Sequence, residues 1–236
     1  MTARVLILTT SHDTLGETGR PTGFHWQELT DPYWAFRDAG YEVDIASVHG
    51  GKPPADPGSD DGEGDRPASV QRFMDDARAM SALTHSRPAA HITPHDYDAV
   101  YLPGGHGTMW DLPHSAAVAE LISRAWDQGA IVAAVCHGPA ALTGVTLPDG
   151  TPLVKGKRVN SFTDAEERKA GLEEVVPFLL ESRLRELGAE FEANEEAFGP
   201  HVARDGRLIT GQNPASCEKL AEQILKALKE KQSEPA

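Results

Sequence analysis

The sequence predicts an α/β fold, in which helices cover both faces of a mostly parallel sheet. Strand and helix patterns alternate with short connections along most of the 236 residues, as in parallel strands joined by crossover helices. The apolar runs are continuous, which is typical of strands buried on both faces. A chain of this length can bury one substantial core. By length alone, the chain could form one large domain or two small ones.

The expected elements follow one another in order. The expected strands are Arg4–Thr9, Glu42–Ser47, Ala99–Leu102, Ile131–Val135, Lys157–Ser161 and Leu208–Gly211. Helical spacing of apolar residues marks Gln27–Ala39, Val118–Gln128 and Ala215–Lys231. A further helix is expected directly after Cys136. Ligands of such sheets bind beyond the carboxyl ends of the strands, so the turns that follow Leu102 and Val135 are the places to search for function.

The segment 50–93 interrupts this alternation. The stretch KPPADPGSDDGEGD within it is rich in Gly, Pro and Asp and is unsuited to a core element. Ser69–Ser86 follows with helical spacing. We interpret residues 50–93 as an insertion, a loop plus a helix, that projects over the sheet edge like a lid.

Charge and composition exclude several classes of partner. The net charge is −14 without a Lys/Arg cluster, which argues against nucleic acid and against an anionic membrane surface. The longest apolar runs are far shorter than a membrane span, and the N-terminal run fits a buried strand better than a signal peptide. We therefore expect a cytoplasmic protein. Two cysteines make a disulfide framework improbable, and the ten histidines lack metal-ligand spacing, so we expect neither metal nor cofactor.

The stretch AAVCHGPAAL, residues 133–142, carries the strongest chemical signal. An apolar strand ends at Cys136, and Gly138 and Pro139 open the element that follows. This is the pattern of a nucleophile elbow, a sharp turn that presents one side chain at the carboxyl edge of the sheet. A helix N-terminus behind the sulfur would favour the thiolate. We expect Cys136 to be the nucleophile, and a packing or incidental role for Cys217.

Groups that could assist Cys136 are found in two further turns. Thiolate attack on a carbonyl needs hydrogen-bond donors for the oxyanion, and the glycine turn at residues 104–107 allows close approach. We expect the backbone N–H groups of Gly105 and His137 to form this oxyanion hole. The imidazole of His137 is the obvious base, and a third group should orient it. SFTDAEE offers three acids for that role, Asp164, Glu166 and Glu167. Spacing does not choose among them, and any two could be solvated surface acids.

Five stretches in order resemble the ThiJ/PfpI superfamily, which has a type 1 glutamine amidotransferase-like fold. They are TGFHWQEL (22–29), GGHGT (104–108), AVCHGPA (134–140), SFTDAEE (161–167) and DGRLITGQNPAS (205–216). They are most similar to its branch of heat-shock holding chaperones and glutathione-independent glyoxalases (glyoxalase III). The resemblance implies a single domain over residues 1–236, a flavodoxin-like three-layer αβα sandwich and a homodimer. It also implies cysteine-dependent conversion of methylglyoxal and related α-oxoaldehydes to hydroxy acids, without glutathione or metal, and protein deglycation as a reported further activity.

The resemblance also assigns residues. By position, Cys136 and His137 match the nucleophile and its partner, Glu167 matches the triad acid, and Glu28 matches the acid that hydrogen-bonds the nucleophilic sulfur. Related branches carry Asp as the triad acid, so Asp164 and Glu166 stay open.

Three other functions remain alternatives. A stress-induced holding chaperone would bind unfolded protein clients on exposed apolar surface. A PfpI-type peptidase usually requires higher-order assembly. A glutamine amidotransferase-like hydrolase carries a late His-x-Glu pair, whereas this chain has His201-Val202-Ala203.

Overall fold

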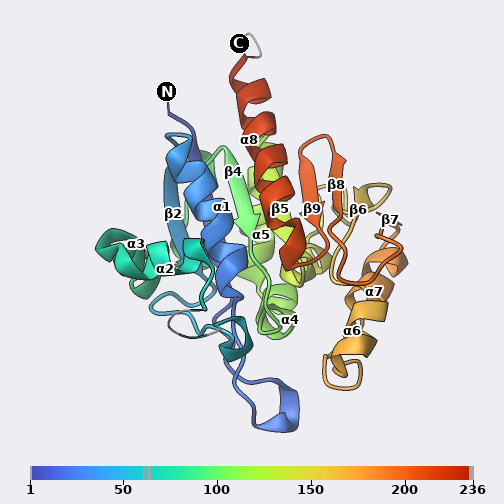
Figure 1. Ribbon diagram of the computed structural model, residues 1–236. Helices are drawn as coiled ribbons and strands as arrows, with labels where there is room; N and C mark the ends of the chain where they lie inside the picture. The colour runs from blue at the N-terminus through green and yellow to red at the C-terminus, as the bar shows by residue number, and fades with distance from the viewer. Residues whose placement is uncertain (1, 61, 63–64, 234–236) are drawn as a thin grey trace.

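A seven-stranded sheet lies at the centre of the computed structural model, which describes residues 2–60, 62 and 65–233 (Figure 1). The strand order is β3-β2-β1-β4-β5-β9-β8. The strands are β1 Arg4–Thr9, β2 Glu42–Ser47, β3 Arg87–Pro88, β4 Ala99–Leu102, β5 Ile131–Val135, β8 Val202–Asp205 and β9 Leu208–Gly211. All neighbours pair in parallel except β8 and β9, which are antiparallel. The predicted mostly parallel sheet is confirmed.

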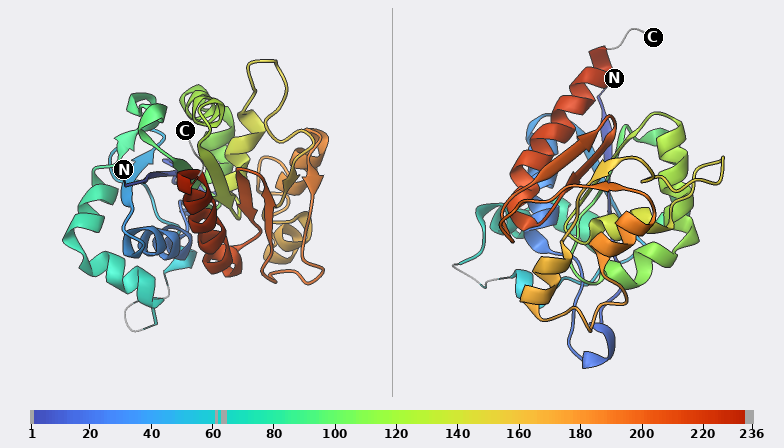
Figure 2. Two further views of the ribbon diagram at one scale, coloured as in Figure 1. Left: turned by 90° about the horizontal axis from the view of Figure 1, so that it is seen from above. Right: turned by 90° about the vertical axis from the view of Figure 1, so that its right-hand side faces the viewer.

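Helices cover both faces of this sheet (Figure 2). The α-helices are α1 Trp26–Asp38, α2 Ala68–Asp75, α3 Ala77–Thr84, α4 Thr108–Asp111, α5 Ala116–Asp127, α6 Asp164–Ala170, α7 Leu180–Glu186 and α8 Cys217–Ser233. Short 3-10 helices lie at Gly16–Thr18, Pro57–Ser59, Ala89–His91, Pro94–Asp96, Leu112–His114, Gly138–Gly144 and Pro214–Ser216. Helices α1 and α8 pack together on one face, and α5 lies on the other.

Two apolar cores form because successive strand side chains point to opposite faces. In β1, Leu6 and Leu8 join the core under α5, whereas Val5 and Ile7 join the core under α1 and α8. Each of these four side chains is fully buried. The continuous apolar runs of the sequence thus reflect burial on both faces of the sheet.

Several elements differ from the sequence-based expectation. The segment after Cys136 is a 3-10 helix, Gly138–Gly144, and not an α-helix. The helix expected over Ser69–Ser86 is two helices, because Asp76 has an extended backbone and caps α3 by accepting hydrogen bonds from the N–H groups of Arg78 and Ala79. The strand expected at Lys157–Ser161 is only β6, Arg158–Val159, and it pairs outside the main sheet with β7, Glu190–Phe191.

The segment 50–93 contains both helices α2 and α3 and the edge strand β3. Helix α2 packs on α1, and β3 extends the main sheet by pairing with β2. Residues 61, 63 and 64 of this segment lie outside the described residues, as do residue 1 and residues 234–236 at the chain ends.

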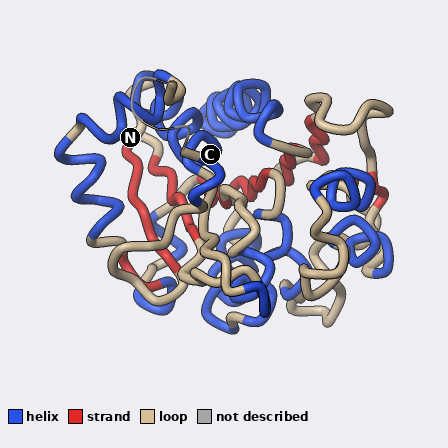
Figure 3. Tube along the Cα trace, turned by 60° about the horizontal axis from the view of Figure 1, so that its bottom comes forward, coloured by secondary structure: helices blue, strands red, loops and turns tan. Residues whose placement is uncertain are grey.

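The parallel strands all end at the edge that Figure 3 brings forward, where loops and short helices gather. The turns after β4 and β5 lie side by side at this edge, since the two strands pair in register from Ala99 with Ile131 to Leu102 with Ala134.

Candidate active site

Cys136 lies directly after β5, in a backbone conformation that side chains disfavour. Its φ is +58°, in the left-handed region, and such strain at a non-glycine residue points to function. The backbone is held on both sides: the N–H of Cys136 donates to the Gly211 carbonyl at 2.9 Å, and its carbonyl accepts from the Phe162 N–H at 2.8 Å. Gly138 completes the turn, because a Cβ there would lie 2.2 Å from the Leu102 carbonyl oxygen.

The structure brings Cys136, His137 and Glu167 together. Nδ1 of His137 lies 3.2 Å from the sulfur of Cys136, and Nε2 of His137 lies 2.7 Å from Oε2 of Glu167. All three side chains are buried. Because a carboxylate only accepts, Nε2 of His137 carries the hydrogen in this pairing, and Nδ1 is left to accept the thiol proton.

Electrostatics favour an ionised Glu167 and a neutral His137. Burial raises the pKa of Glu167, but hydrogen bonds from His106 and His137 outweigh it and lower that pKa to about 2. Burial lowers the pKa of His137, and the neighbouring His106 lowers it further, against the opposing effect of Glu167. A neutral imidazole beside the thiol is the form that can act as a base.

Glu28, in the first turn of α1, is buried against the same turns. Its Oε2 accepts a hydrogen bond of 2.7 Å from the N–H of Gly104. Its Oε1 lacks a partner of hydrogen-bonding geometry among the described residues, although the Cys136 thiol is near enough to lower the pKa of the carboxyl. Burial dominates and raises that pKa to about 8. Glu28 is therefore mostly protonated at neutral pH and has a proton to donate.

The sequence predicts a lowered pKa for the Cys136 thiol, but the environment of the thiol raises that pKa. Burial raises the pKa of Cys136 well above its ordinary value, and Glu28 adds to this rise only in its ionised form, which is the minor form at neutral pH. The expected α-helix, whose N-terminus was to favour the thiolate, is a seven-residue 3-10 helix. Burial thus favours the neutral form of the Cys136 thiol.

The two residues expected to supply the oxyanion hole lie in adjacent turns. Gly105 has a φ of +100°, and a Cβ on it would lie 2.2 Å from the Gly23 carbonyl oxygen, so glycine is required there. The N–H groups of Gly105 and His137 have no protein acceptor within the described part of the chain, which leaves both available to a ligand.

The three acids of SFTDAEE have distinct environments. Glu167 is the one that contacts His137. Asp164 accepts hydrogen bonds from the N–H and the hydroxyl of Ser182, which joins α6 to α7.

Glu166 is fully buried and is not a solvated surface acid, which corrects that expectation. It accepts hydrogen bonds from the Thr163 N–H and hydroxyl, the Phe198 N–H, and the side chains of Gln212 and Asn213. The carboxylate of Glu166 therefore anchors four points of the surrounding loops.

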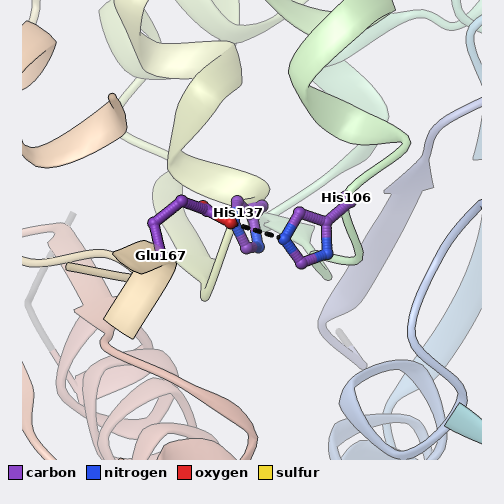
Figure 4. A group of neighbouring side chains, drawn as sticks. All are labelled: His106, His137 and Glu167. Carbon is purple, nitrogen blue, oxygen red and sulfur yellow. Dashed lines mark hydrogen bonds and ion pairs between the residues drawn. The ribbon is translucent and has the colours of Figure 1, made fainter. Parts of the chain in front are cut away.

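Sequence reasoning missed the side chain of His106. The turn GGHG was considered for its glycines alone, although a histidine at the carboxyl end of a strand beside the elbow was a usable signal. Nε2 of His106 lies 2.8 Å from Oε1 of Glu167 (Figure 4), and its ring centroid lies 4.0 Å from that of His137. Their ligand atoms and one oxygen of Glu167 lie within 4.8 Å of one another, close enough for a metal ion. Nε2 of each imidazole already pairs with an oxygen of Glu167, so we interpret the group as a hydrogen-bonded bridge.

Cys217 has a different environment. It is buried at the start of α8, where burial raises the pKa of its thiol well above the ordinary value.

The chain resembles known proteins over nearly its whole length. A model of the DJ-1/PfpI family matches residues 21–227. "Glyoxalase 3" of Candida albicans is 30% identical over 238 residues, with 94% of this chain and 97% of that protein covered. "Glutathione-independent glyoxalase HSP31" of Saccharomyces cerevisiae is 31% identical over 232 residues, with 95% and 97% covered. The crystal structure of glyoxalase III from Candida albicans matches with a TM-score of 0.88, 30% identity, and 95% and 97% covered.

Proposed function

The chain belongs to the DJ-1/PfpI family, and from this premise we propose that it is a glutathione-independent glyoxalase that converts methylglyoxal and related α-oxoaldehydes to hydroxy acids. Its relatives with this named activity span nearly the whole chain. The observation that carries the proposal is the buried line of contacts from Cys136 through His137 to Glu167. Glu28 beside the thiol adds a second group able to move a proton.

The first step is addition of the sulfur to the aldehyde carbon. His137 accepts the thiol proton at Nδ1, and Glu167 stabilises the resulting imidazolium. The N–H groups of Gly105 and His137 bind the developing alkoxide. Return of the proton to this oxygen gives a hemithioacetal and restores neutral His137.

The second step moves hydrogen from C1 to C2. A base removes the C1 proton to give an enediolate, and a proton added at C2 gives the thioester of the hydroxy acid. His137 and Glu28 are the two groups beside the sulfur that transfer these protons. Water then hydrolyses the thioester and regenerates the thiol. Oxidation at C1 balances reduction at C2, so atoms and electrons balance without an added redox agent.

The test is lactate release from methylglyoxal in the absence of glutathione. The wild-type protein and Cys217→Ser should release lactate, and Cys136→Ser should not. Turnover that survives in Cys136→Ser, or a wild-type protein that releases no lactate, would overturn the proposal.

Other properties remain predictions from the sequence and the resemblance. These are the homodimer, the cytoplasmic location, the deglycation of protein adducts and the binding of unfolded clients. Among the described residues, Phe198 is the exposed large apolar side chain, which gives a holding chaperone little apolar surface in this chain. No helix in the described ranges is long and apolar enough to cross a membrane.

A further inference from the structure

Two imidazoles share the carboxylate of Glu167. His137 lies 2.7 Å from Oε2, and His106 lies 2.8 Å from Oε1. The side chain of His106 is 18% exposed, whereas those of His137 and Glu167 are 1% and 4% exposed. His106 thus closes the outer side of a buried bridge whose inner side reaches the nucleophile.

We propose that His106 is a positioning residue, which holds Glu167 in the one orientation that fixes the tautomer of His137. This role belongs to the site of the proposed function, and only its kcat measurement rests on that function. A glutamate side chain has several rotatable bonds, and one hydrogen bond leaves its carboxylate free to rotate. Hydrogen bonds to both oxygens remove that freedom, since each imidazole donates from its own side.

The backbone places His106 rigidly enough for this role. It lies in the turn between β4 and α4, directly beside the elbow. The hydroxyl of Thr108 lies within hydrogen-bonding distance of the Gly105 carbonyl, at 2.8 Å, and of the His137 carbonyl, at 3.0 Å. One buried side chain therefore ties the turn of His106 to the turn of His137. Glu167 comes from α6, whose start is fixed by a capping box between Thr163 and Glu166.

The donor in the outer hydrogen bond must be His106. Glu167 is ionised, because its pKa is lowered to about 2, and a carboxylate only accepts. Nε2 of His106 therefore carries a hydrogen in both its neutral and its charged form. A glutamine amide has a reach similar to that of Nε2 and would supply the same donor without a charge.

His106 also acts on His137 by charge. His106 lowers the pKa of His137, while Glu166 and Glu167 act in the opposite direction. Other neighbours of the pair are the Cys136 thiol, 3.2 Å from His137, and the uncharged ring of Phe162, which contacts both imidazoles. Removing His106 should therefore raise the pKa of His137. Because the base must be neutral, the acid limb of kcat/KM should move to higher pH.

The experiment compares His106→Leu, His106→Gln and wild type. The control is His95→Leu, since the exposed His95 lies before β4, at the opposite edge of the sheet. Side-chain ¹⁵N NMR should find hydrogen on Nε2 of His137 in wild type, His106→Gln and the control. His106→Leu should give a mixture of tautomers, because Glu167 is free to rotate. Its kcat should fall about 10- to 100-fold, the scale of losing a hydrogen bond that orients a functional side chain. KM should change little, and His106→Gln should recover most of the rate.

A single tautomer of His137 in His106→Leu with wild-type kcat would overturn the inference. It would equally be overturned if His106→Gln were as impaired as His106→Leu while folded, because the hydrogen bond would then not be what matters. The NMR readout needs no substrate. A wild-type protein without lactate formation but with a tautomer that depends on His106 would therefore refute the proposed function and leave the positioning role standing.

Discussion

Oε2 of Glu28 accepts a 2.7 Å hydrogen bond from the N–H of Gly104, which ties the first turn of α1 to the glycine turn after β4. The carboxyl is fully buried, and its other oxygen is left for the Cys136 side. Burial raises its pKa to about 8. A proton is thus held beside a thiol whose own ionisation is opposed by burial.

Replacement of Glu28 should separate sulfur activation from proton transfer. Glu28→Gln keeps a hydrogen-bond donor but loses the titrating proton, so Cys136 should alkylate at a near wild-type rate while turnover collapses. Glu28→Leu loses both, and the apparent pKa of the Cys136 thiol should rise by about one unit per 1.4 kcal/mol of lost interaction. The measurements are the pH dependence of iodoacetamide alkylation and lactate formation. Wild-type turnover in Glu28→Gln would assign proton transfer to His137 alone.

Glu28 should also make stability depend on pH. Its pKa is raised in the folded protein from an ordinary value of 4.5 to about 8, so the folded state binds the proton more tightly. This contribution to stability is fully present below about pH 4.5 and is lost as the pH rises through about 8. In a Cys136→Ser background, the free energy of unfolding of the Glu28→Gln variant should rise relative to that of Cys136→Ser alone as the pH increases from about 5 to about 9. Urea unfolding at several pH values measures this, and parallel stability curves would contradict the raised pKa.

The strands next to the site could be predicted from the sequence because they are buried on both faces. The predicted ranges of β4 and β5 agree with the structure, since a strand covered on both faces is a continuous apolar run that ends where the chain returns to the surface. Strand β8 was missed because it is an edge strand with one fully buried residue, Ala203. It forms a hairpin with β9, in which Gly206 has a φ of +60°.

The elbow could also be predicted, but the environment of the acids could not. Glu166 and Glu167 are adjacent in α6, so their side chains point about 100° apart around the helix. Which direction meets His137 depends on how α6 packs, and the sequence pattern does not contain that information. The sequence pattern also does not show that the Cys136 thiol is buried, and this burial is why the predicted low pKa of the thiol is wrong.

Glutamine should affect activity at Glu167 and stability at Glu166. Glu167→Gln removes the charge that stabilises the His137 imidazolium, so kcat should fall by about three to four orders of magnitude while the fold survives. Steady-state kinetics and a urea melt of the same preparation decide this. Loss below about tenfold would remove Glu167 from the proposed triad.

Glu166→Gln should instead unfold more easily. The NH₂ group of the new amide is itself a donor and cannot accept hydrogen bonds from Thr163, Phe198, Gln212 and Asn213. We therefore expect a loss of about 3 kcal/mol or more in the free energy of unfolding. Urea denaturation measures it, with the exposed Glu186, in a surface pair with Arg183, as the control position. A change below about 0.5 kcal/mol, ordinary for a surface site, would contradict the buried network.

At Phe198, glycine should be a more stabilising replacement than alanine, which is the reverse of the usual order. Its φ is +67° and its side chain is 48% exposed, and its N–H is held by Glu166 at 2.7 Å. Alanine keeps the left-handed strain, which is about 1–2 kcal/mol, whereas glycine relieves it. Phe198→Gly should therefore be more stable than Phe198→Ala by about 1 kcal/mol. Thermal melts of the two variants test this, and a more stable alanine variant would count against the strained backbone.

The two cysteines should differ in reactivity even though both are buried, at 4% and 1% exposure. Burial raises the pKa of each thiol, so neither is expected to be reactive through acidity alone. Cys136 has a neutral imidazole 3.2 Å away and lies at the carboxyl edge of the sheet, whereas Cys217 starts a helix inside the apolar core. Iodoacetamide should therefore label Cys136 much faster, as followed by peptide mass spectrometry. His137→Ala should slow that labelling and leave Cys217 unchanged, because the base is removed without altering the core. Equal labelling of both cysteines in the folded protein would refute the assignment of Cys136 as the nucleophile.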